Sequence, residues 1–276
     1  MKAHHSMMRL LPAFVMVLVA ILSLTEAKVL AAGRLWNLYQ EGESSFRQAN
    51  DLLQTDPARA RLLFERAVLC FEAVHREGGI ENGRLCYNIG NVYFRLGHMG
   101  KAILNYRRAE RFIPHDLNLQ QNLSYARSRL ADRIEPKPET QVLRTIFFWH
   151  YDLGGTVRAW LLAAAAGFFW LAVGISLLLR RSWLRYLTVF YALVCLLLAG
   201  SVALDAYEQA YIHPGVILEG EVIGRKGDST TFEPSFKEPL HMGVEFKLVE
   251  ARQGWFHIEL TDGRRCWIPA SAAELI

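Results

Sequence analysis

The chain has 276 residues, of which 52% are hydrophobic and 21% are charged, and its formal net charge is +4. This length is enough for two modest domains together with membrane segments. So small a charge gives no reason to expect nucleic-acid binding, and the four cysteines are too scattered to form the framework of a disulfide-stapled protein. Cys70 and Cys86 fall on adjacent predicted helices, either as a disulfide or as two free core thiols.

The N-terminal 27 residues are typical of a secretory signal peptide. Lys2 and Arg9 precede an apolar run at 10–24, which is followed by the sequence TEA. A basic start, about 15 apolar residues and a small residue at the exit are the features of such signals. We expect a signal peptide at 1–27 with cleavage after Ala27, and an uncleaved anchor is the alternative.

Residues 83–116 carry a regular pattern of small residues, aromatic residues and a proline. These are Gly90, Ala102 and Ala109, then Tyr93 and Tyr106, and finally Pro114. The pattern resembles one complete tetratricopeptide (TPR) repeat, a 34-residue helical hairpin. Small residues let the two helices approach closely, aromatic rings fill the space between repeats, and the proline ends the second helix.

A weaker copy of the same pattern precedes this segment. Residues 35–53 and 58–75 predict two helices, with Asp56 and Pro57 as the start signal of the second. The small-aromatic-small spacing recurs 42 residues earlier, at Ala60, Phe64 and Ala67. A further helix at 117–133 would cover the end of the stack, so we expect an all-α TPR hairpin stack over 28–134.

The first helix of each hairpin is expected to line a concave surface. The candidate partner-binding residues there are Arg84, Tyr87, Asn88, Asn91 and Arg95, with Asn122 from the capping helix. Arginines and amides in such a groove can hold an extended peptide backbone or a carboxylate. The alternative is structural, because asparagines at the positions of Asn88 and Asn91 often hold neighbouring TPR helices together.

Residues 135–156 are expected to be a linker and juxtamembrane segment. Its first part, EPKP at 135–138, is a stiff and polar spacer. The following stretch, 140–151, ends in FFWHY and predicts a segment that lies on the membrane surface.

Two apolar segments follow, at 157–179 and 186–205, and they predict a transmembrane helical hairpin. Each has about the 20 apolar residues needed to cross a hydrocarbon core of about 30 Å. Neither 159–179 nor 186–204 contains an Asp, Glu, Lys, Arg or His, which argues against an ion or proton pathway and favours a simple anchor.

The connector between these segments, 180–185, predicts the orientation of the hairpin. It contains Arg180, Arg181 and Arg185, and such residues favour the cytoplasmic side. Residues before and after the hairpin would then both lie on the opposite side, which agrees with export by the signal peptide.

After a linker at 206–214, the pattern changes to period two over 215–276. We expect strands at 216–218, 222, 244–249, 254–260 and 265–268, a long loop at 224–239, and a hairpin turn at 261–264. In the strand WFHIEL, the alternation places Phe256, Ile258 and Leu260 on the core face.

The run GWFHIELTDGRRCWIPASAAELI resembles the end of a bacterial SH3-like domain, a small all-β barrel. Trp255 and Trp267 are either a ligand platform or packing residues. The turn at 270–273 lacks the tyrosine of the polyproline groove, which argues against a polyproline ligand.

The sequence contains no recognised enzyme motif and no histidine pattern that indicates a metal site, so we expect neither catalysis nor a cofactor. The rival interpretation is an exported cysteine hydrolase that uses Cys266 and His257. Both residues fall on adjacent strands of a barrel too small to enclose a catalytic pocket.

The order of signal, TPR stack, membrane hairpin and SH3-like domain resembles the E-type (BatE-like) protein of the bacterial aerotolerance operon. The strongest local match runs from LCYNIGN at 85–91 to NLSYAR at 122–127. Such proteins are encoded beside MoxR-type ATPases and membrane proteins with von Willebrand A domains.

The resemblance implies a non-catalytic scaffold or adaptor in the bacterial inner (cytoplasmic) membrane. Its TPR groove would bind other envelope proteins on the periplasmic or external side, in a stress-tolerance complex that includes von Willebrand A proteins. The alternative is a peptidoglycan-binding module in which the TPR stack is only a spacer.

Overall fold

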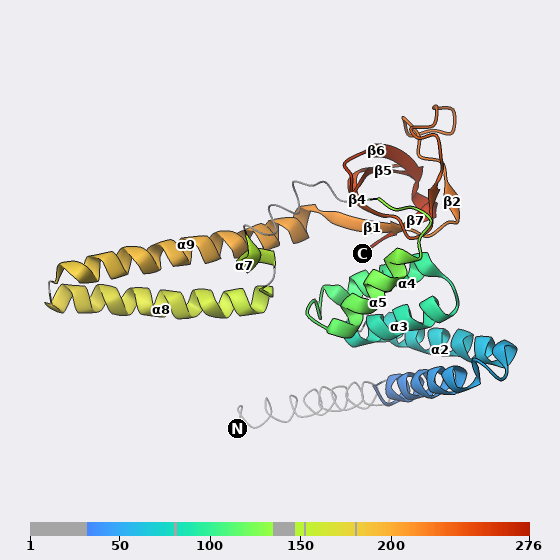
Figure 1. Ribbon diagram of the computed structural model, residues 1–276, viewed down its shortest axis with the longest axis horizontal. Helices are drawn as coiled ribbons and strands as arrows, with labels where there is room; N and C mark the ends of the chain where they lie inside the picture. Colours follow the sequence, from blue (N-terminus) through green and yellow to red (C-terminus); the bar gives the residue numbers. More distant parts are fainter. Residues whose placement is uncertain (1–31, 80–81, 135–146, 152, 180) are drawn as a thin grey trace, which may run out of the picture. The chain divides into compact units, whose positions relative to one another are not determined.

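The structure is a computed structural model that describes residues 32–79, 82–134, 147–151, 153–179 and 181–276 (Figure 1). The predicted signal peptide and the EPKP spacer lie outside the described residues. The chain divides into two compact units, 1–98 and 99–276.

The first unit is helical. Residues 32–52 form a helix, and α2 (Pro57–Gly78) and α3 (Gly83–Arg95) follow. The start of α2 is set by Asp56, whose side chain accepts a hydrogen bond from the Arg59 backbone N–H at 3.0 Å, and by the proline in the first turn. The helix ends at Gly79, whose φ of 55° is a left-handed conformation that suits glycine.

Helix 32–52 packs closely on α2. A Cβ at Gly42 would lie 2.8 Å from a ring carbon of Phe71, so only glycine permits this approach. The small-aromatic-small residues of the weaker repeat, Ala60, Phe64 and Ala67, are all buried, and the Phe64 ring lies 5.6 Å from that of Phe46 on helix 32–52. Their spacing therefore marks core positions, as the sequence predicts.

The second unit contains helices and an antiparallel sheet. Its first helices are α4 (Met99–Glu110) and α5 (Leu117–Ser128). The sheet consists of β1 (His213–Ile217), β4 (Glu245–Arg252), β5 (Trp255–Leu260), β6 (Arg265–Pro269) and β7 (Ala273–Leu275), in the order β6-β5-β4-β1-β7. A separate pair is formed by β2 (Glu221–Val222) and β3 (Leu240–His241), and the 3-10 turn η1 (Ala270–Ala272) precedes β7.

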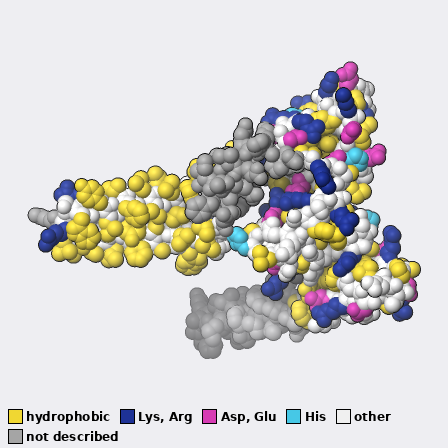
Figure 2. All heavy atoms as spheres, viewed as in Figure 1, with side chains coloured by type: hydrophobic (Ala, Val, Ile, Leu, Met, Phe, Trp, Pro, Cys, Tyr) yellow, Lys and Arg dark blue, Asp and Glu magenta, His cyan; other side chains and the backbone are white. Residues whose placement is uncertain are grey.

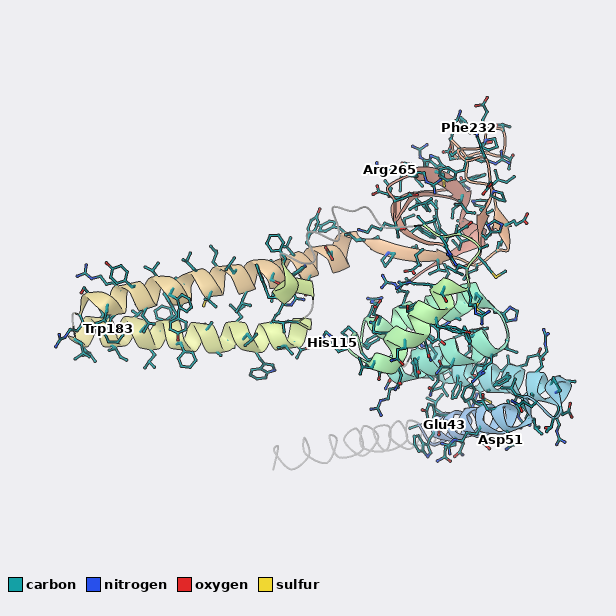
Figure 3. All side chains as sticks on the ribbon, viewed as in Figure 1. Glu43, Asp51, His115, Trp183, Phe232 and Arg265 are labelled. Carbon is teal, nitrogen blue, oxygen red and sulfur yellow. The ribbon has the colours of Figure 1, made fainter. Side chains whose placement is uncertain are left out.

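The strand pattern of the sequence matches the sheet. β5 and β6 pair through a turn in which Gly263 has a φ of 85°. Ile258 and Leu260 are buried in the core with Phe246, and Phe256 packs against the same core from a half-buried position. The predicted long loop at 224–239 projects from the sheet and carries Phe232 (Figure 3).

α4 and α5 pack directly on the sheet, although α8 and α9 separate them from it in the sequence. A Cβ at Gly100, in the first turn of α4, would lie 2.8 Å from the carbonyl oxygen of Ile217. Gly243 has a φ of 91°, and a Cβ there would collide with the side chain of Leu130 just beyond α5. Two glycines thus allow the helices to lie against the strand backbone.

Hydrogen bonds and ion pairs also link α4 and α5 to the sheet. Glu245 on β4 accepts hydrogen bonds from Arg127 Nε at 2.6 Å and Nη2 at 3.0 Å. Arg107 Nε lies 3.0 Å from the same carboxylate, in an ion pair without hydrogen-bond geometry. Asp132 accepts from the backbone N–H of His241 at 2.8 Å and lies 3.0 Å from its ring nitrogen. Residues 99–134 thus lie in the same compact unit as the sheet.

A short helix, α7 (Phe148–Tyr151), precedes the long antiparallel helices α8 (Gly155–Leu179) and α9 (Ser182–Tyr211). Both long helices are apolar and long enough to cross a membrane, and only 11% of each apolar window is buried. Figure 2 shows a nearly continuous hydrophobic surface along this hairpin, with basic side chains at its tip. Trp183 lies at that tip and is 59% exposed (Figure 3).

The boundaries of the hairpin differ from the sequence prediction. α8 begins at Gly155 rather than at 157, and α9 begins at Ser182 rather than at 186, so the connector is shorter than 180–185. The predicted linker at 206–214 is instead the end of α9 and the start of β1. The bounds differ because the prediction followed the apolar stretch alone, whereas the hydrogen bonds of each helix continue through the polar residues that flank it.

Candidate interaction sites

A cavity of about 480 Å³ lies in the first unit, where helix 32–52, α2 and α3 meet. Its lining residues are Ala32, Leu35, Trp36, Tyr39, Val74, Asn82, Arg84 and Leu85. Apolar side chains form most of the wall, and Arg84 supplies a positive charge. This combination can hold an apolar or aromatic group next to an anionic or carbonyl group.

Two aromatic rings of helix 32–52 dominate this cavity. Trp36 is 59% exposed and stacks on Tyr39 with 5.9 Å between ring centroids. Tyr39 in turn lies 5.6 Å from the ring of Phe71 on α2. Burial, and then the charge of Glu43, raise the pKa of Tyr39, so its hydroxyl stays neutral. Neither ring was among the predicted site residues, although their spacing of three places them on one helix face.

The predicted residues Arg84 and Asn88 have different roles in the structure. Arg84 is exposed and lines the cavity. Asn88 donates a hydrogen bond from Nδ2 to the Tyr39 hydroxyl at 3.2 Å and so ties α3 to helix 32–52. This contact is the structural role that the sequence left open for Asn88, and it also fixes the Tyr39 ring in the cavity wall.

The other predicted groove residues lie away from the cavity walls. Tyr87 and Asn91 are half-buried on α3, and Arg95 is exposed at the end of that helix. Asn122 is half-buried on α5, which belongs to the second unit. The structure therefore brings Arg84 and Asn88 to one place together with Trp36 and Tyr39.

Trp255 and Trp267 both lie on the outer face of the sheet, but they do not form an open platform. Trp267 is 8% exposed, because the His257 ring stacks on it at 4.7 Å and the Arg252 guanidinium lies 4.7 Å from its centroid. Trp255 is half-buried and pairs with Pro269 across the strands. Trp267 thus takes the packing role that the sequence left as an alternative, and Trp255 offers part of its ring to solvent.

A polar cluster that the sequence did not predict lies where the two long helices meet α7. Arg158 on α8 is 4% exposed and forms an ion pair with Asp205 on α9. The Arg158 Nη1 donates to Ser201 Oγ at 2.5 Å and lies 2.7 Å from His150 Nδ1. Because arginine only donates hydrogen bonds, His150 accepts at Nδ1. The sequence did carry a sign of this cluster, since Arg158 and Asp205 directly border the two uncharged stretches at 159–179 and 186–204.

This cluster contains serine, histidine and aspartate but not the geometry of a hydrolase triad. Ser201 Oγ lies 2.8 Å from His150 Nδ1, and Asp205 approaches that same nitrogen at 3.8 Å. A triad needs the serine and the carboxylate on opposite ring nitrogens. The cluster therefore joins helices and does not activate Ser201.

The cysteine hydrolase interpretation also meets a geometric obstacle. Cys266 points into the core and is 2% exposed, and burial raises the pKa of its thiol to about 12. His257 stacks on Trp267 on the opposite face of the sheet. Neutral and separated from its base, this thiol lacks the properties of a nucleophile. Cys70 and Cys86 are both buried and are not joined in a disulfide, and the described residues contain no cluster suited to a metal ion.

No family model matches the chain, and a search of curated proteins finds no significant match.

Proposed function

We propose that the protein is a non-catalytic, membrane-anchored adaptor that holds a segment of another envelope protein in the cavity of its first unit. The observation that carries this proposal is the juxtaposition of Trp36, Tyr39 and Arg84 around about 480 Å³ of open space. An exposed tryptophan and a half-buried tyrosine beside an arginine are of the residue types that dominate protein recognition.

Membrane anchoring is supported by the exposure of the hairpin. A core helix of a soluble protein would be mostly buried, whereas the apolar windows of α8 and α9 are 11% buried. Exposed apolar surface on this scale requires a lipid or protein environment. The position of the helices, far from the N-terminus, also separates them from a signal sequence.

The contact between α4–α5 and the sheet supports a topology with both ends of the hairpin on the same side. Residues 99–134 precede the two long helices, residues 213–276 follow them, and Glu245 links the two segments through Arg107 and Arg127. Two segments that touch cannot be on opposite sides of a bilayer. The arginines of the connector then favour the periplasmic or external side for both.

The finer classification belongs to the same proposal. The bounds of α3 and α4 fall within the 34-residue pattern at 83–116, which supports a TPR hairpin, and the antiparallel sheet with its η1 turn supports an SH3-like domain. With the BatE-like order of segments, the proposed partners are envelope proteins, including von Willebrand A membrane proteins of a stress-tolerance complex.

Site-specific photo-cross-linking in intact membranes tests the adaptor role. A photoreactive amino acid at position 36 is expected to give discrete adducts with another envelope protein. The matched control is position 69 on α2, where Leu69 is 62% exposed and does not line the cavity. Adding Arg84→Glu should reduce the adducts at position 36 about tenfold, because it reverses the charge beside the bound segment.

Equal adduct patterns at positions 36 and 69, or adducts unaffected by Arg84→Glu, would reject the cavity as the partner site. Circular dichroism of the Arg84→Glu protein controls for helix loss. Arg84 is exposed, so the helices are expected to stay intact.

Peptidoglycan binding is the second candidate, favoured by the partly exposed Trp255 on the outer face of the sheet. The full-length protein should then cosediment with purified sacculi, and Trp255→Ala should reduce the bound fraction. No retention of the unaltered protein would remove this candidate and leave the adaptor proposal in place.

A further inference from the structure

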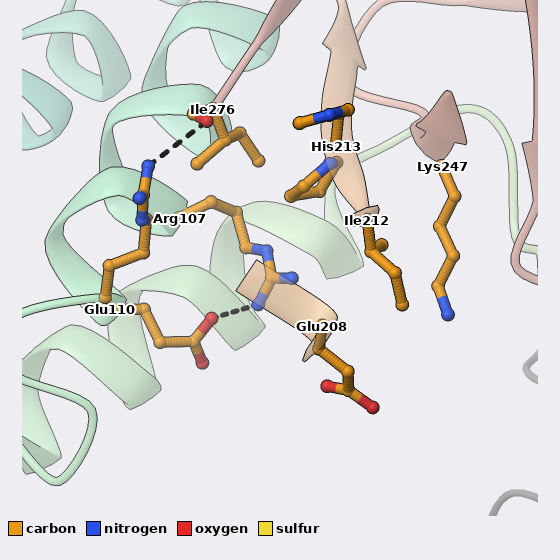
Figure 4. Close-up of a pocket in the computed structure, with 9 residues that line it drawn as sticks. Arg107, Glu110, Glu208, Ile212, His213, Lys247 and Ile276 are labelled. Carbon is orange, nitrogen blue, oxygen red and sulfur yellow. Dashed lines mark hydrogen bonds and ion pairs between the residues drawn. The ribbon is translucent and has the colours of Figure 1, made fainter. Parts of the chain in front are cut away.

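A second cavity, of about 400 Å³, lies in the 99–276 unit beside the end of α9 (Figure 4). Its walls come from α4, the last turn of α9, and strands β1 and β4. The charged residues that line it are Arg107, Glu110, Arg111, Glu208 and Lys247. Unlike the cavity of the first unit, this one is mainly a site for charged groups.

The charges in this cavity fall into two sets. Arg107 is already neutralised by Glu110 and Glu245. Arg111 donates one hydrogen bond to a backbone oxygen of Ile276 at 3.2 Å, and a guanidinium has five donors. The exposed side chains of Lys247 and Glu208 have no ion pair within the described part of the chain. Lys247, the remaining donors of Arg111 and the carboxylate of Glu208 are therefore available to a ligand.

The depth of the cavity matches the headgroup layer of a bilayer. The stretch of α9 without charged residues ends at Leu204, and Glu208 in the cavity wall follows about 6 Å further along at 1.5 Å per residue. The headgroup layer on each side of the hydrocarbon core is about 5–7 Å thick. Tyr207 and Tyr211 are 59% and 68% exposed at this level, where aromatic rings prefer the membrane interface.

We propose that this cavity binds the phosphoethanolamine headgroup of a phospholipid. Arg111 and Lys247 would hold the phosphate, and Glu208 would accept hydrogen bonds from the ammonium group. A headgroup with phosphate as its only charge leaves Glu208 without a partner, and a trimethylammonium group has no N–H to donate. This inference rests on the membrane insertion proposed above.

The test uses the full chain, purified in detergent and freed of lipid. Phosphatidylethanolamine, phosphatidylglycerol and phosphatidylcholine with identical acyl chains are added, and retained lipids are counted by native mass spectrometry. We expect phosphatidylethanolamine to bind about tenfold more tightly than phosphatidylcholine. Soluble glycerophosphoethanolamine forms a separate arm, and its binding at equal affinity would mean that the site takes the free headgroup rather than the lipid.

Variants identify the charges involved. Lys247→Ala with Arg111→Ala should weaken binding of phosphatidylethanolamine about tenfold or more, whereas Glu208→Gln should abolish its advantage over phosphatidylglycerol. Lys237→Ala, at another exposed lysine, is the matched control and should change nothing.

Equal binding of all three lipids, or a preference unaffected by these variants, would overturn the proposal. Alkaline extraction of membranes separates this failure from that of the anchor. A protein that resists extraction but shows no lipid preference leaves the adaptor proposal standing, whereas an extracted protein contradicts both.

Discussion

Two arginine–carboxylate clusters join distant segments of this chain, and they differ in their surroundings. Glu245 binds Arg107 and Arg127 between α4, α5 and the sheet, where the side chain of Arg127 is 42% exposed. Arg158 binds Asp205 between α8 and α9, where the arginine side chain is 5% exposed. In the first cluster solvent reaches Arg127, although Glu245 is only 18% exposed and the Nε of Arg107 is buried; the second cluster adjoins the apolar surface of the hairpin.

This difference decides what each cluster does for stability. Exposed ion pairs contribute little, because solvent screens them and their side chains lose freedom. A buried pair also gives little net stability, but removal of one partner leaves an uncompensated charge. We therefore expect the hairpin cluster to tolerate loss of both partners far better than loss of one, and the Glu245 cluster to respond weakly to either change.

The largest effect is expected from Asp205→Leu, which leaves Arg158 charged and without its carboxylate. Stability of the hairpin should fall by about 3–5 kcal/mol, measured by tryptophan fluorescence during denaturation in mixed detergent. The double variant Arg158→Met with Asp205→Leu should recover most of this loss. Arg185→Met, at an exposed arginine near the hairpin tip, is the control. A double variant as unstable as the single one would show that the pair itself, rather than the orphaned charge, matters.

Gly243→Ala tests whether close packing, rather than ion pairing, holds the helices to the sheet. Its φ of 91° disfavours a side chain, and the new Cβ would collide with Leu130. We expect a loss of about 2–4 kcal/mol in the free energy of unfolding.

The matched control is Gly254→Ala, where φ is 78° but no atom lies within 4 Å of the new Cβ. It reports the backbone strain alone, about 1–2 kcal/mol. Equal losses at both sites would mean that the contact with Leu130 relaxes without penalty.

Glu245→Gln should have a smaller effect, a loss of about 1 kcal/mol, since solvent reaches its partner Arg127. The loss should shrink further in 1 M salt, because the Debye length there is about 3 Å. Thermal unfolding in low and high salt measures both values. A loss well above 1 kcal/mol that does not depend on salt would contradict this prediction. Glu245 would then behave as part of a buried ion pair, as Asp205 is expected to do.

The sequence predicted those features that depend on local periodicity. Alternation in WFHIEL placed Ile258 and Leu260 in the core, and the two apolar stretches located α8 and α9. Packing across long sequence distances was not predicted. Gly100 and Gly243 carry no local sign that each faces a segment more than a hundred residues away.

The candidate site was predicted only in part, for a similar reason. Arg84 was found because it lies on the repeat's first helix, whereas Trp36 precedes the recognisable pattern and depends on how helix 32–52 meets α3. Arg158 and Asp205 were passed over because each alone is an ordinary charge at a helix end. Only the antiparallel pairing of α8 and α9 brings them together.

The smallest effect on stability is expected at His257. Here arginines lie near an imidazole ring rather than a carboxylate, and the effect depends on pH. Burial first, and then the charge of Arg265, lower the pKa of His257 below its usual 6.5. The other charged neighbours are Glu250, Arg252 and Glu259. Above pH 6.5 the folded and unfolded chains both hold a neutral ring, so the stabilising packing on Trp267 is fully present. As the pH falls from 6.5 through the lower folded pKa, the unfolded chain binds the proton first and stability decreases.

His257→Gln should flatten this decrease in thermal unfolding between pH 7.5 and 5, whereas His213→Gln, at an exposed histidine, should retain it. An unchanged slope in His257→Gln would assign the acid sensitivity to other groups and leave the ring stack without a role in it.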